Sequence, residues 1–473
     1  MNLQEQLAEE IFGPIREATG KENIPIFCVG GFVRDLLLGR ECKDVDFVCL
    51  GSGVDTAEAI ARHLGKDIRV HVFRNFGTAQ FRFADWDIEF VGARKESYDR
   101  NSRKPVVENG TLEDDQNRRD FTINALAISV HPDSFGELTD PFGGLEDLKN
   151  GLIRTPLDPD VTFSDDPLRM MRAIRFATQL GFTIEEKTYE ALHRNRDRIR
   201  IISQERITDE LQKIIQSKIP SIGFKLLENS GLLSIIFSEL QVLKGVENYE
   251  GKGHKDNFYH TLQVLDNVAE MGGGLWLRWA ALLHDIAKPV TKKFEPGQGW
   301  TFHGHEVLGS KWVPAIFRRF KLPMDDPMKF VKKLVFLHLR PIVLSRDEIT
   351  DSAIRRLLFD AGDDIDALLM LCKADITTKN PRKMLQYLEN LDIVRKRMEE
   401  VEAKDHLRNF QPPVDGSLIM QIFGLKPGRE VGQIKEAIRE EILEGRLPNA
   451  YEPAFEFMLA RGKEMGLHRV DIV

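Results

Sequence analysis

Residues 29–46 read VGGFVRDLLLGRECKDVD, and this stretch decides the fold of the first third of the chain. The apolar run from Ile24 to Val29 predicts a strand, and the two glycines that follow it favour a tight turn. Phe32 to Leu38 then predict a helix, which ends at Gly39. A second strand is predicted from Val45 to Leu50. The order strand, turn, helix, strand indicates a unit that mixes strands with helices.

Two aspartates flank Val45 at the start of that second strand. Because successive side chains of a strand point to opposite faces, Asp44 and Asp46 share one face, about 6 to 7 Å apart at their Cα atoms. Such a pair can hold divalent cations that activate an attacking hydroxyl and neutralise a leaving phosphate. A lone Asp-x-Asp pair is more often a solvated strand edge. Here the turn at Gly30-Gly31 shifts the balance, because backbone N–H groups there can approach a phosphate, with Arg34 one turn later.

The rest of the chain divides into further strands and a long helical part. Strands are predicted at three more places, Ile68 to Phe73, Thr78 to Phe83 and Asp87 to Val91. Met1 to Ile15 predicts an amphipathic first helix, and from about Asp160 onward helical spacing dominates with no convincing strand. Gly251 to Gly253 and Gln411 to Gly416 have the composition of linkers. We therefore expect four parts, a head at 1–150, a helical neck and body at 151–250, a third unit at 251–395 and a helical tail at 396–473.

The segment from Val29 to Asp35, followed by Asp44-Val45-Asp46, resembles the signature of class II tRNA nucleotidyltransferases and bacterial poly(A) polymerases, members of the polymerase beta superfamily. The resemblance implies an α+β fold, in which a head with a mixed sheet and helices precedes an all-helical neck, body, HD domain and tail. It also implies that Asp44 and Asp46 bind Mg²⁺ and support attack of an RNA 3′-hydroxyl on the α-phosphate of a nucleoside triphosphate. Many relatives use a third carboxylate, for which Glu89 is placed suitably. Asp87 shares its face, and a surface role is an equal alternative.

Two further segments resemble the parts of this family that bind the incoming nucleotide. Arg118-Arg119-Asp120 resembles the segment that contacts ribose and phosphates, although such a cluster can also be a surface ion-pair group. Asp166 and Arg169 match the family's EDxxR motif, whose leading Glu is Asp165 here. Lying three apart on a predicted helix, they are expected to share a face and to form either a simple ion pair or a reader of base edges.

A carboxylate beside a guanidinium suits the base edges of cytosine and adenine, which offer an amino donor next to a ring-nitrogen acceptor. Guanine and uracil would turn a carbonyl oxygen toward the carboxylate. CTP and ATP would therefore be chosen without a nucleic-acid template. The expected nucleotide-binding residues are Gly30, Gly31, Arg34, Arg118, Arg119, Asp120, Asp166, Arg169, Arg172 and Arg175.

The charge pattern bears on RNA binding. The formal net charge is −8, so any RNA site must be a local basic patch. The best candidate contains four arginines with only Asp197 opposing them, namely Arg194, Arg196, Arg198 and Arg200. A solvated helix face is an equal alternative for any one of them. The Lys/Glu-rich tail resembles that of HD-bearing bacterial enzymes and is expected to help grip the RNA.

A polar pair, His284-Asp285, interrupts a strongly apolar helix in the second half of the chain. Metal coordination would explain its burial, because imidazole and carboxylate are ligands for Zn, Mn, Fe or Ni. With His260 upstream and Asp375 downstream, the order His, His-Asp, Asp resembles the HD superfamily of metal-dependent phosphohydrolases. His305 and His338 match the two further histidines of HD proteins with larger metal sites. A lone buried histidine is usually a satisfied core residue, and an HD domain can keep its ligands without an activity.

Together these features predict a tRNA nucleotidyltransferase that adds or repairs the 3′-terminal CCA from CTP and ATP, with Mg²⁺ in the head and a transition metal in the HD domain. Poly(A) addition stays open, as do addition of only CC or only A and an HD phosphohydrolase whose head merely senses nucleotide. The four cysteines form no CxxC pair, and we find neither a secretory leader nor an apolar run long enough to cross a bilayer. We therefore expect a cytoplasmic protein with no membrane partner, whose oligomeric state the sequence leaves open.

Overall fold

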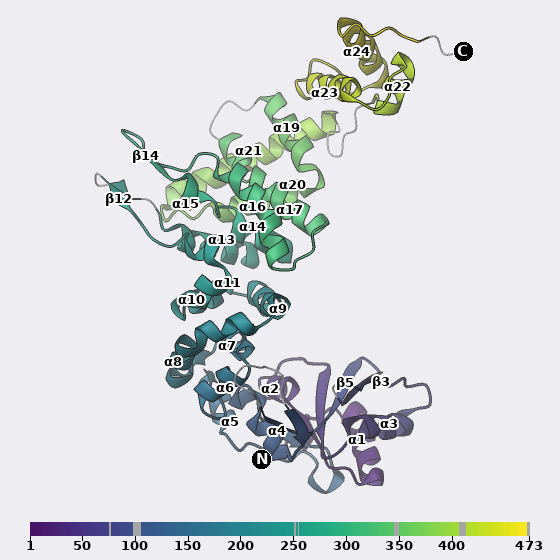
Figure 1. Ribbon diagram of the computed structural model, residues 1–473, viewed down its shortest axis with the longest axis vertical. Helices are drawn as coiled ribbons and strands as arrows, with labels where there is room; N and C mark the ends of the chain where they lie inside the picture. Colours follow the sequence, from purple (N-terminus) through teal and green to yellow (C-terminus); the bar gives the residue numbers. More distant parts are fainter. Residues whose placement is uncertain are drawn as a thin grey trace. The chain divides into compact units, whose positions relative to one another are not determined.

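The first unit of the chain is built on a seven-stranded sheet in the order β3-β4-β5-β2-β1-β8-β9 (Figure 1). β2 and β5 run parallel, and every other neighbouring pair in this sheet is antiparallel. The predicted mixed sheet is therefore confirmed. The strands are β1 (Ile26–Val29), β2 (Asp44–Cys49), β3 (His71–Phe73), β4 (Thr78–Phe83), β5 (Trp86–Gly92), β8 (Ala127–Ser129) and β9 (Leu138–Thr139), and a separate two-stranded ribbon consists of β6 (Arg94–Ser97) and β7 (Val106–Asn109).

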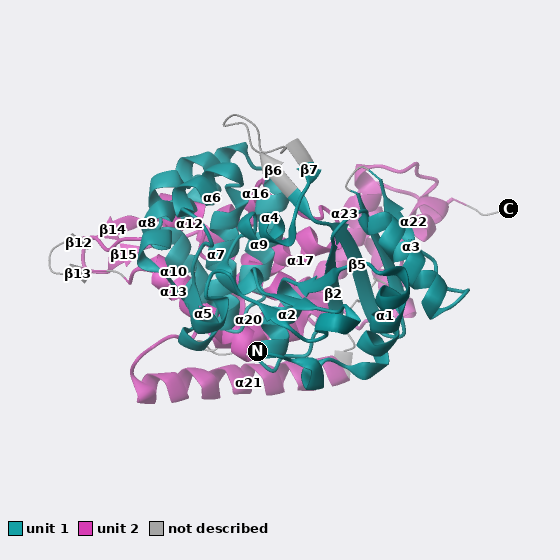
Figure 2. Cartoon of the chain, turned by 90° about the horizontal axis from the view of Figure 1, so that it is seen from below, with its two compact units in different colours: residues 1–238 teal, residues 239–473 magenta. Residues whose placement is uncertain are grey.

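This computed structural model describes residues 1–74, 77–97, 106–249, 252–253, 255–344, 350–405 and 413–470. The chain forms two compact units, Met1–Ser238 and Glu239–Val473 (Figure 2). Gly251 and residues 411–412 of the predicted linkers lie outside the described residues. The division into four parts stays a prediction.

One face of the sheet is covered by α1 and α3, which pack against each other (Figure 1). Phe12 of α1 meets Phe47 of β2 edge to face, with 6.1 Å between ring centroids. Phe47 in turn stacks on Phe90 of β5 at 5.1 Å. All three rings are fully buried, so they form the apolar core on this side of the sheet.

The opposite face carries the acidic side chains. Val45 and Phe47 are buried on the core side, and alternation along β2 leaves Asp44 and Asp46 exposed on the other. A shift of the strand by one residue would bury both carboxylates against the aromatic core. The apolar core therefore fixes the register that presents the two acids.

Helices complete the first unit, and α7 joins the helical part to the head. Phe176 of α7 packs edge to face on Phe121, with 5.8 Å between ring centroids. The helices are α1 (Glu9–Glu22), α2 (Gly31–Leu37), α3 (Gly53–Leu64), α4 (Leu112–Asn117), α5 (Gly144–Asn150), α6 (Pro159–Asp165), α7 (Leu168–Leu180), α8 (Glu186–Asn195), α9 (Gln204–Ile215), α10 (Pro220–Asn229), α11 (Leu232–Ile236) and α12 (Ser238–Gln241), the last of which crosses into the second unit.

The second unit is a helical assembly with a buried aromatic core. Trp279 of α14 is fully buried and packs against Phe320 and Phe317, with centroid separations of 5.7 and 6.1 Å. Its helices are α13 (Asn257–Glu270), α14 (Leu275–Leu283), α15 (Lys288–Thr291), α16 (His305–Arg319), α17 (Asp326–Leu337), α18 (Arg340–Leu344), α19 (Asp351–Ala361), α20 (Ile365–Asp375), α21 (Pro381–Asp405), α22 (Gly416–Phe423), α23 (Arg429–Leu443) and α24 (Tyr451–Glu464).

Two details of the predicted secondary structure were wrong. The first helix starts later, because α1 runs from Glu9 to Glu22 and a short 3₁₀ turn precedes it. Short strands also occur beyond Asp160, too short to leave a period-two pattern in the sequence. They are β11 (Thr183–Ile184), which pairs with β10 (Leu152–Ile153), β12 (Asn248–Tyr249) with β13 (Lys252–Gly253), and β14 (Lys293–Glu295) with β15 (Gly299–Thr301). Within the described part of the chain, none of the helices combines the length and apolarity needed to cross a bilayer.

Candidate functional site

Two neighbouring strands bring four acidic side chains together on the open face of the sheet. In the parallel pairing of β2 and β5, Asp44 lies opposite Asp87 and Asp46 lies opposite Glu89. All four line a cavity of about 690 Å³. Partial desolvation raises the pKa of Asp46. The charge of Arg119 acts in the opposite direction, and the charge of Asp44 raises this pKa further. The pKa of Glu89 is also raised, by burial and by the charge of Asp46. The carboxylates of this cluster thus favour a bound positive charge, and their oxygen atoms fit a hard divalent cation.

A second cavity, of about 450 Å³, shares Asp46 with the first. It brings together all ten residues that the sequence suggested for nucleotide binding. Seven arginines face three aspartates there, so its net charge is positive and suits a polyphosphate. The lining residues are Gly30, Gly31, Arg34, Asp46, Arg118, Arg119, Asp120, Asn124, Asp166, Leu168, Arg169, Arg172, Arg175, Phe176 and Arg206.

Gly30 lines the second cavity, close to Asp46, which both cavities share. Its φ of 73° is in the left-handed region, which favours glycine. A Cβ atom at this position would lie 3.0 Å from Nη1 of Arg119 and 3.6 Å from Oδ2 of Asp46. The glycine therefore allows the backbone to pass directly beside a carboxylate and a guanidinium of the site.

Asp115 holds the two adjacent arginines in place. Its side chain is fully buried and accepts hydrogen bonds from Arg118 (Nε to Oδ1, 2.9 Å) and from Arg119 (Nη2 to Oδ2, 2.8 Å). Burial alone would raise the pKa of Asp115, but the two guanidiniums outweigh it and hold this pKa below its ordinary value. Sequence reasoning missed Asp115. The available signal was its position three and four residues before the arginines, which places the three side chains together on one helical turn.

Asp120 plays a similar part for Arg172. Its carboxylate accepts a hydrogen bond from Nε of Arg172 at 2.6 Å, from the side chain of Asn124 at 3.0 Å and from the backbone N–H of Phe121 at 2.9 Å. Burial opposes ionisation, but the Arg172 charge and these hydrogen bonds lower the pKa of Asp120 to about 2. Asp120 is therefore engaged in orienting an arginine of the cavity wall.

The relation between Asp166 and Arg169 differs from the predicted one. Asp166 is extended (φ −132°) and precedes α7, so the two residues do not share a helical face. Oδ1 of Asp166 accepts the backbone N–H of Leu168 at 3.2 Å, and Arg169 donates to the carbonyl of Arg118 at 2.5 Å. Oδ2 of Asp166 lies 3.4 Å from Nη2 of Arg206, a residue of α9 that sequence reasoning missed. Both Asp166 and Arg169 still line the same cavity.

Phe176 gathers three guanidiniums around one buried ring. The Cζ atoms of Arg175, Arg34 and Arg172 lie 3.9, 5.0 and 5.4 Å from its centroid. These distances are within the range of cation–π attraction. Arg175 also donates to Glu210 at 2.5 Å and is buried, so it is the cavity arginine most fully engaged by the protein itself.

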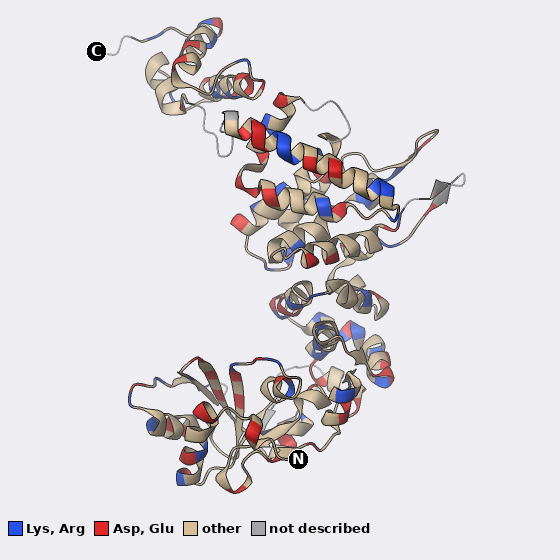
Figure 3. Ribbon diagram, turned by 180° about the vertical axis from the view of Figure 1, so that it is seen from behind, with Lys and Arg blue, Asp and Glu red and all other residues tan. Residues whose placement is uncertain are grey.

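The arginine run suggested for RNA binding is more fully paired than the sequence indicated. It consists of Arg194, Arg196, Arg198 and Arg200. Within the run itself only Asp197 opposes the arginines, but the fold adds two further acids, because Asp160 of α6 and Glu190 of α8 lie 2.8 and 3.5 Å from Arg194. Arg196 and Arg198 donate to backbone carbonyls, and Arg200 lies 3.6 Å from Asp197. Figure 3 shows the same mixture of signs on the helices of both units.

The six residues suggested as HD-domain metal ligands come together in the second unit. They are supplied by five helices, mostly at their ends. The residues are His260 within α13, His284 and Asp285 directly after α14, His305 at the start of α16, His338 directly after α17, and Asp375 at the end of α20.

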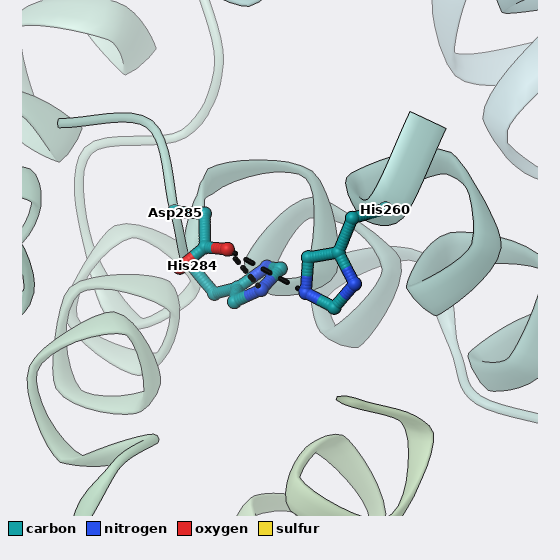
Figure 4. A group of neighbouring side chains, drawn as sticks. All are labelled: His260, His284 and Asp285. Carbon is teal, nitrogen blue, oxygen red and sulfur yellow. Dashed lines mark ion pairs between the residues drawn. The ribbon is translucent and has the colours of Figure 1, made fainter. Parts of the chain in front are cut away.

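Asp285 lies between two pairs of imidazoles. Its Oδ2 is 3.2 Å from Nε2 of His284 and 3.5 Å from Nε2 of His260, as Figure 4 shows. Its Oδ1 is 3.2 Å from Nε2 of His305 and 3.9 Å from Nε2 of His338. Two groups of potential ligands therefore share one fully buried carboxylate.

The outer nitrogens of the histidines are occupied in a regular way. His284, His305 and His338 each donate Nδ1–H to the carbonyl oxygen three residues earlier, at 2.7 Å in every case. His260 has its Nδ1 2.9 Å from Oγ1 of Thr377. This arrangement turns all four Nε2 atoms toward the centre, as neutral imidazole ligands require. Nε2 of His284 is fully buried and makes no hydrogen bond among the described residues, so the donor set fits a bound cation.

The electrostatics of the histidines also fit a bound cation. Burial lowers the pKa of His338 to about 3, so this histidine is neutral at ordinary pH. Burial acts against charge on His284 too, but Asp285 raises its pKa above the ordinary value. The buried carboxylate thus favours a positive charge beside it, which a bound metal ion would supply.

Known proteins match the chain along most of its length. Three family models match, described as Poly A polymerase head domain (residues 26–154), Probable RNA and SrmB-binding site of polymerase A (181–243) and HD domain (257–377). The A-adding tRNA nucleotidyltransferase of Deinococcus radiodurans is 33% identical over 70% of this chain and 75% of its own length. The multifunctional CCA protein of Shewanella frigidimarina is 34% identical over 63% of this chain and 70% of its own length. The A-adding tRNA nucleotidyltransferase of Aquifex aeolicus is 30% identical over 88% of this chain, which spans only 44% of that relative.

Solved structures with the same fold cover nearly the whole chain. The CCA-adding enzyme of Bacillus stearothermophilus, in complex with CTP, has a TM-score of 0.67 at 23% identity, over 97% of this chain and 98% of its own. The CCA-adding enzyme of Thermotoga maritima, complexed with tRNA, has a TM-score of 0.59 at 21% identity over the same shares. These likenesses confirm the predicted α+β fold with its helical remainder.

Proposed function

The chain belongs to the tRNA nucleotidyltransferase family, as its motifs predicted, and we propose that it adds C, C and A to the 3′ end of tRNA from CTP and ATP. The observation that carries the proposal is the junction of two cavities at Asp46. One cavity is rich in acids that suit Mg²⁺, and the other is rich in arginines that suit a triphosphate.

The proposed reaction joins the RNA 3′-hydroxyl oxygen to the α-phosphorus, while the bond from that phosphorus to pyrophosphate breaks. Asp44, Asp46 and Glu89 are the residues proposed to hold Mg²⁺. Glu89 is preferred to Asp87 because it lies opposite Asp46 and its pKa responds to that charge. Mg²⁺ bound there would lower the pKa of the attacking hydroxyl and offset charge on the phosphates. The arginines around Phe176 and Asp115 hold the triphosphate in place.

Base selection is proposed for Asp166 and Arg169, although not as neighbours on one helical turn. Asp166 would accept the exocyclic amino group of cytosine or adenine, and Arg169 would donate to the adjacent ring nitrogen. Arg206 pairs with Asp166 in the structure. We propose that it keeps this carboxylate oriented until a base arrives.

Addition of A alone is the second candidate. Two of the relatives described above are named A-adding enzymes, and one of them matches 88% of this chain. The deciding experiment uses three tRNAs, one that lacks the CCA end, one that ends in C and one that ends in CC. Each is incubated with each nucleoside triphosphate, and the length of the product is measured. Growth through C, C and A supports the first proposal, growth by A only on the longest tRNA supports the second, and long A tails would support poly(A) addition instead.

We propose in addition that the HD centre holds divalent transition metal and acts as a phosphohydrolase. Asp285 between two imidazole pairs supports room for more than one ion. Loss of phosphate release in Asp285→Asn with retained nucleotide addition would bear this out, whereas unchanged release would contradict it.

We also propose the four domain boundaries given above. The arginine run near Arg198 and the helical tail (396–473) are both proposed to contact RNA. The free cysteines support a reducing compartment, so the cytoplasm is the proposed location.

A further inference from the structure

We propose that the 3′-terminal strand of the RNA runs from Asp44 and Asp46 across β5 and β4 toward β3, where Arg69 and Arg82 bind its last backbone phosphates. This path lies in the cavity of about 690 Å³ that contains the four acids, here called the acid-rich cavity. The proposal rests on the nucleotide addition proposed above. It adds the direction of the RNA strand and the cations that hold it.

The direction of the strand follows from the geometry of the displacement. The attacking and leaving oxygens lie roughly in line on opposite sides of the phosphorus. With the triphosphate in the cavity rich in arginines (the arginine-rich cavity), pyrophosphate leaves toward that cavity and the RNA hydroxyl arrives from the other side of Asp46. The sheet order places β1, with the turn at Gly30, on one side of β2, and β5, β4 and β3 on the other. The acid-rich cavity lies on this second side and shares only Asp46 with the arginine-rich cavity.

The strand register lines up polar side chains in two rows across this side of the sheet. Residues that lie opposite each other on neighbouring strands point to the same face. The first row is Asp46, Glu89, Gln80 and His71, and the second is Asp44, Asp87 and Arg82. All seven residues line the acid-rich cavity. Each row therefore begins at a carboxylate proposed to hold Mg²⁺ and ends on β3 or β4 at a side chain that can donate to a phosphate.

The guanidinium groups of Arg69 and Arg82 are exposed in this cavity and have no protein partner. Neither forms an ion pair or a hydrogen bond with any residue that the structure describes, although Arg82 lies opposite Asp87 in the register of β4 and β5. All seven arginines of the arginine-rich cavity, by contrast, donate to a protein acceptor. Two open guanidiniums beside the acids therefore fit an acceptor that arrives with the substrate, such as a backbone phosphate.

The positions of the two cations suit a strand whose 3′-hydroxyl lies at the acids. β4 is two strands away from β2, which is about 10 Å at the usual spacing of neighbouring strands. Arg82 on β4 can therefore meet a phosphate close to the 3′ end. Arg69 precedes β3, the edge strand of the sheet, by two residues. It can therefore meet a phosphate further back along the RNA.

The distribution of charge in the acid-rich cavity favours an RNA end over a triphosphate. Five carboxylates and only two arginines line it, so a triphosphate would meet net repulsion there. The terminal ribose of an RNA instead presents neutral hydroxyls, which can donate to carboxylates or bind a metal ion. The phosphates of the RNA begin behind that ribose, where the cations lie. The acids therefore match the hydroxyl end of the strand, and Arg69 and Arg82 match its backbone.

Steady-state kinetics of the full chain at several salt concentrations test the two cations. Arg69→Ala and Arg82→Ala should each raise KM for tRNA roughly fivefold and leave KM for the nucleoside triphosphate unchanged. Each should also reduce the slope of log KM for tRNA against log salt concentration by about 0.7, as expected for the loss of one phosphate contact with a single strand. Arg82→Lys, which keeps the charge, should restore that slope.

Arg62→Ala is the matched control, because Arg62 is exposed on α3, which covers the opposite face of the sheet. It should change neither KM nor the salt dependence. An increase in KM for the triphosphate alone would assign the two cations to the nucleotide and overturn the proposal. Unchanged KM and salt slope for tRNA in Arg69→Ala and Arg82→Ala would overturn it as well.

Equilibrium binding separates this proposal from the addition reaction on which it rests. Two tRNAs are compared, one that ends in CC and one from which the unpaired 3′ nucleotides have been removed. Wild type should bind the first more tightly, and the variant that combines Arg69→Ala with Arg82→Ala should bind both alike. A wild type without this preference contradicts the proposed path.

The two proposals can fail independently. If wild type adds nucleotides to tRNA but the double variant keeps the preference for the tRNA that ends in CC, the RNA path fails and the addition reaction stands. If wild type adds no nucleotide but the double variant loses that preference, Arg69 and Arg82 stand as an RNA site and the addition reaction fails.

Discussion

Arg119 donates both Nε and Nη2 to the same carboxylate oxygen of Asp115, at 3.0 and 2.8 Å. Because Asp115 is fully buried, this contact fixes the guanidinium that lies beside Gly30 and Asp46. We predict that Asp115→Asn lowers kcat/KM for CTP and for ATP alike by roughly 10²-fold, since misplacing a positioned charge costs about that much. Steady-state incorporation assays check this. Asp133→Asn, at a carboxylate that is 91% exposed, is the matched control and should change neither value.

A second prediction concerns Gly30. Gly30→Ala combines an unfavourable φ with a Cβ 3.0 Å from Arg119, whereas Gly39→Ala has a similar φ of 65° and no atom within 4 Å. Both should lose about 1 to 2 kcal/mol of unfolding free energy. Only Gly30→Ala should also lose nucleotide addition, measured at a temperature where both variants are folded. Equal activity of the two variants would show that the close approach at Gly30 is irrelevant to the site.

The third prediction addresses base choice. Asp166→Ala should admit GTP and UTP, with discrimination falling by about 1 to 3 kcal/mol, because the carboxylate that rejects their carbonyl oxygens is gone. Arg206→Ala should lower that discrimination in the same direction but by less, because Asp166 is still present and loses only the partner that orients it. Single-nucleotide incorporation with each of the four triphosphates measures both effects. Retained selectivity in Asp166→Ala would move base selection to other residues.

Asp120 gives a pH-dependent prediction. Its pKa is about 2 in the folded protein and about 4 when unfolded, so folding favours the ionised form. Its contribution, roughly 2 kcal/mol, is complete well above pH 4 and is lost as the pH falls toward 2. Asp120→Asn should therefore be less stable than wild type at pH 7, and the difference should shrink on acidification. Urea unfolding at pH 7 and near pH 3 provides the comparison. A difference that stays constant with pH would place the effect elsewhere.

The fifth prediction separates the two units. Asp285→Asn replaces one oxygen of the carboxylate that the two imidazole pairs share with an amide nitrogen, so the metal content of the purified protein should fall by at least half. Nucleotide addition should stay within twofold of wild type, because Asp285 belongs to the second unit and the arginine-rich cavity proposed to bind nucleotide belongs to the first. Elemental analysis and the incorporation assay report these two quantities. If metal content and nucleotide addition fell together, the metal centre would be needed for the folding or activity of the first unit as well.

Much of the fold followed from local pattern. β1 to β5 were predicted within three residues at each end, because alternation and glycine punctuation mark them. β6 to β9 were not predicted, since two to four residues carry too little pattern. Motifs named ten residues that line the cavity of about 450 Å³, but they did not point to Arg206 or Asp115. Arg206 meets Asp166 across 40 residues of sequence, and such a meeting is set by helix packing and not by spacing. The extended conformation of Asp166 was missed. The prediction placed Asp166 on the same helix as Arg169, whereas α7 begins at Leu168, after Pro167.

The acceptors for three of the metal-centre histidines are main-chain carbonyls of their own turns. Every amino acid carries such a carbonyl, so substitution of the acceptor residues leaves the imidazole orientation intact. The orientation of these rings thus depends on the path of the backbone. The residues that supply the carbonyl acceptors can therefore be substituted extensively without changing it. His260 is the exception, because its outer partner is the replaceable hydroxyl of Thr377.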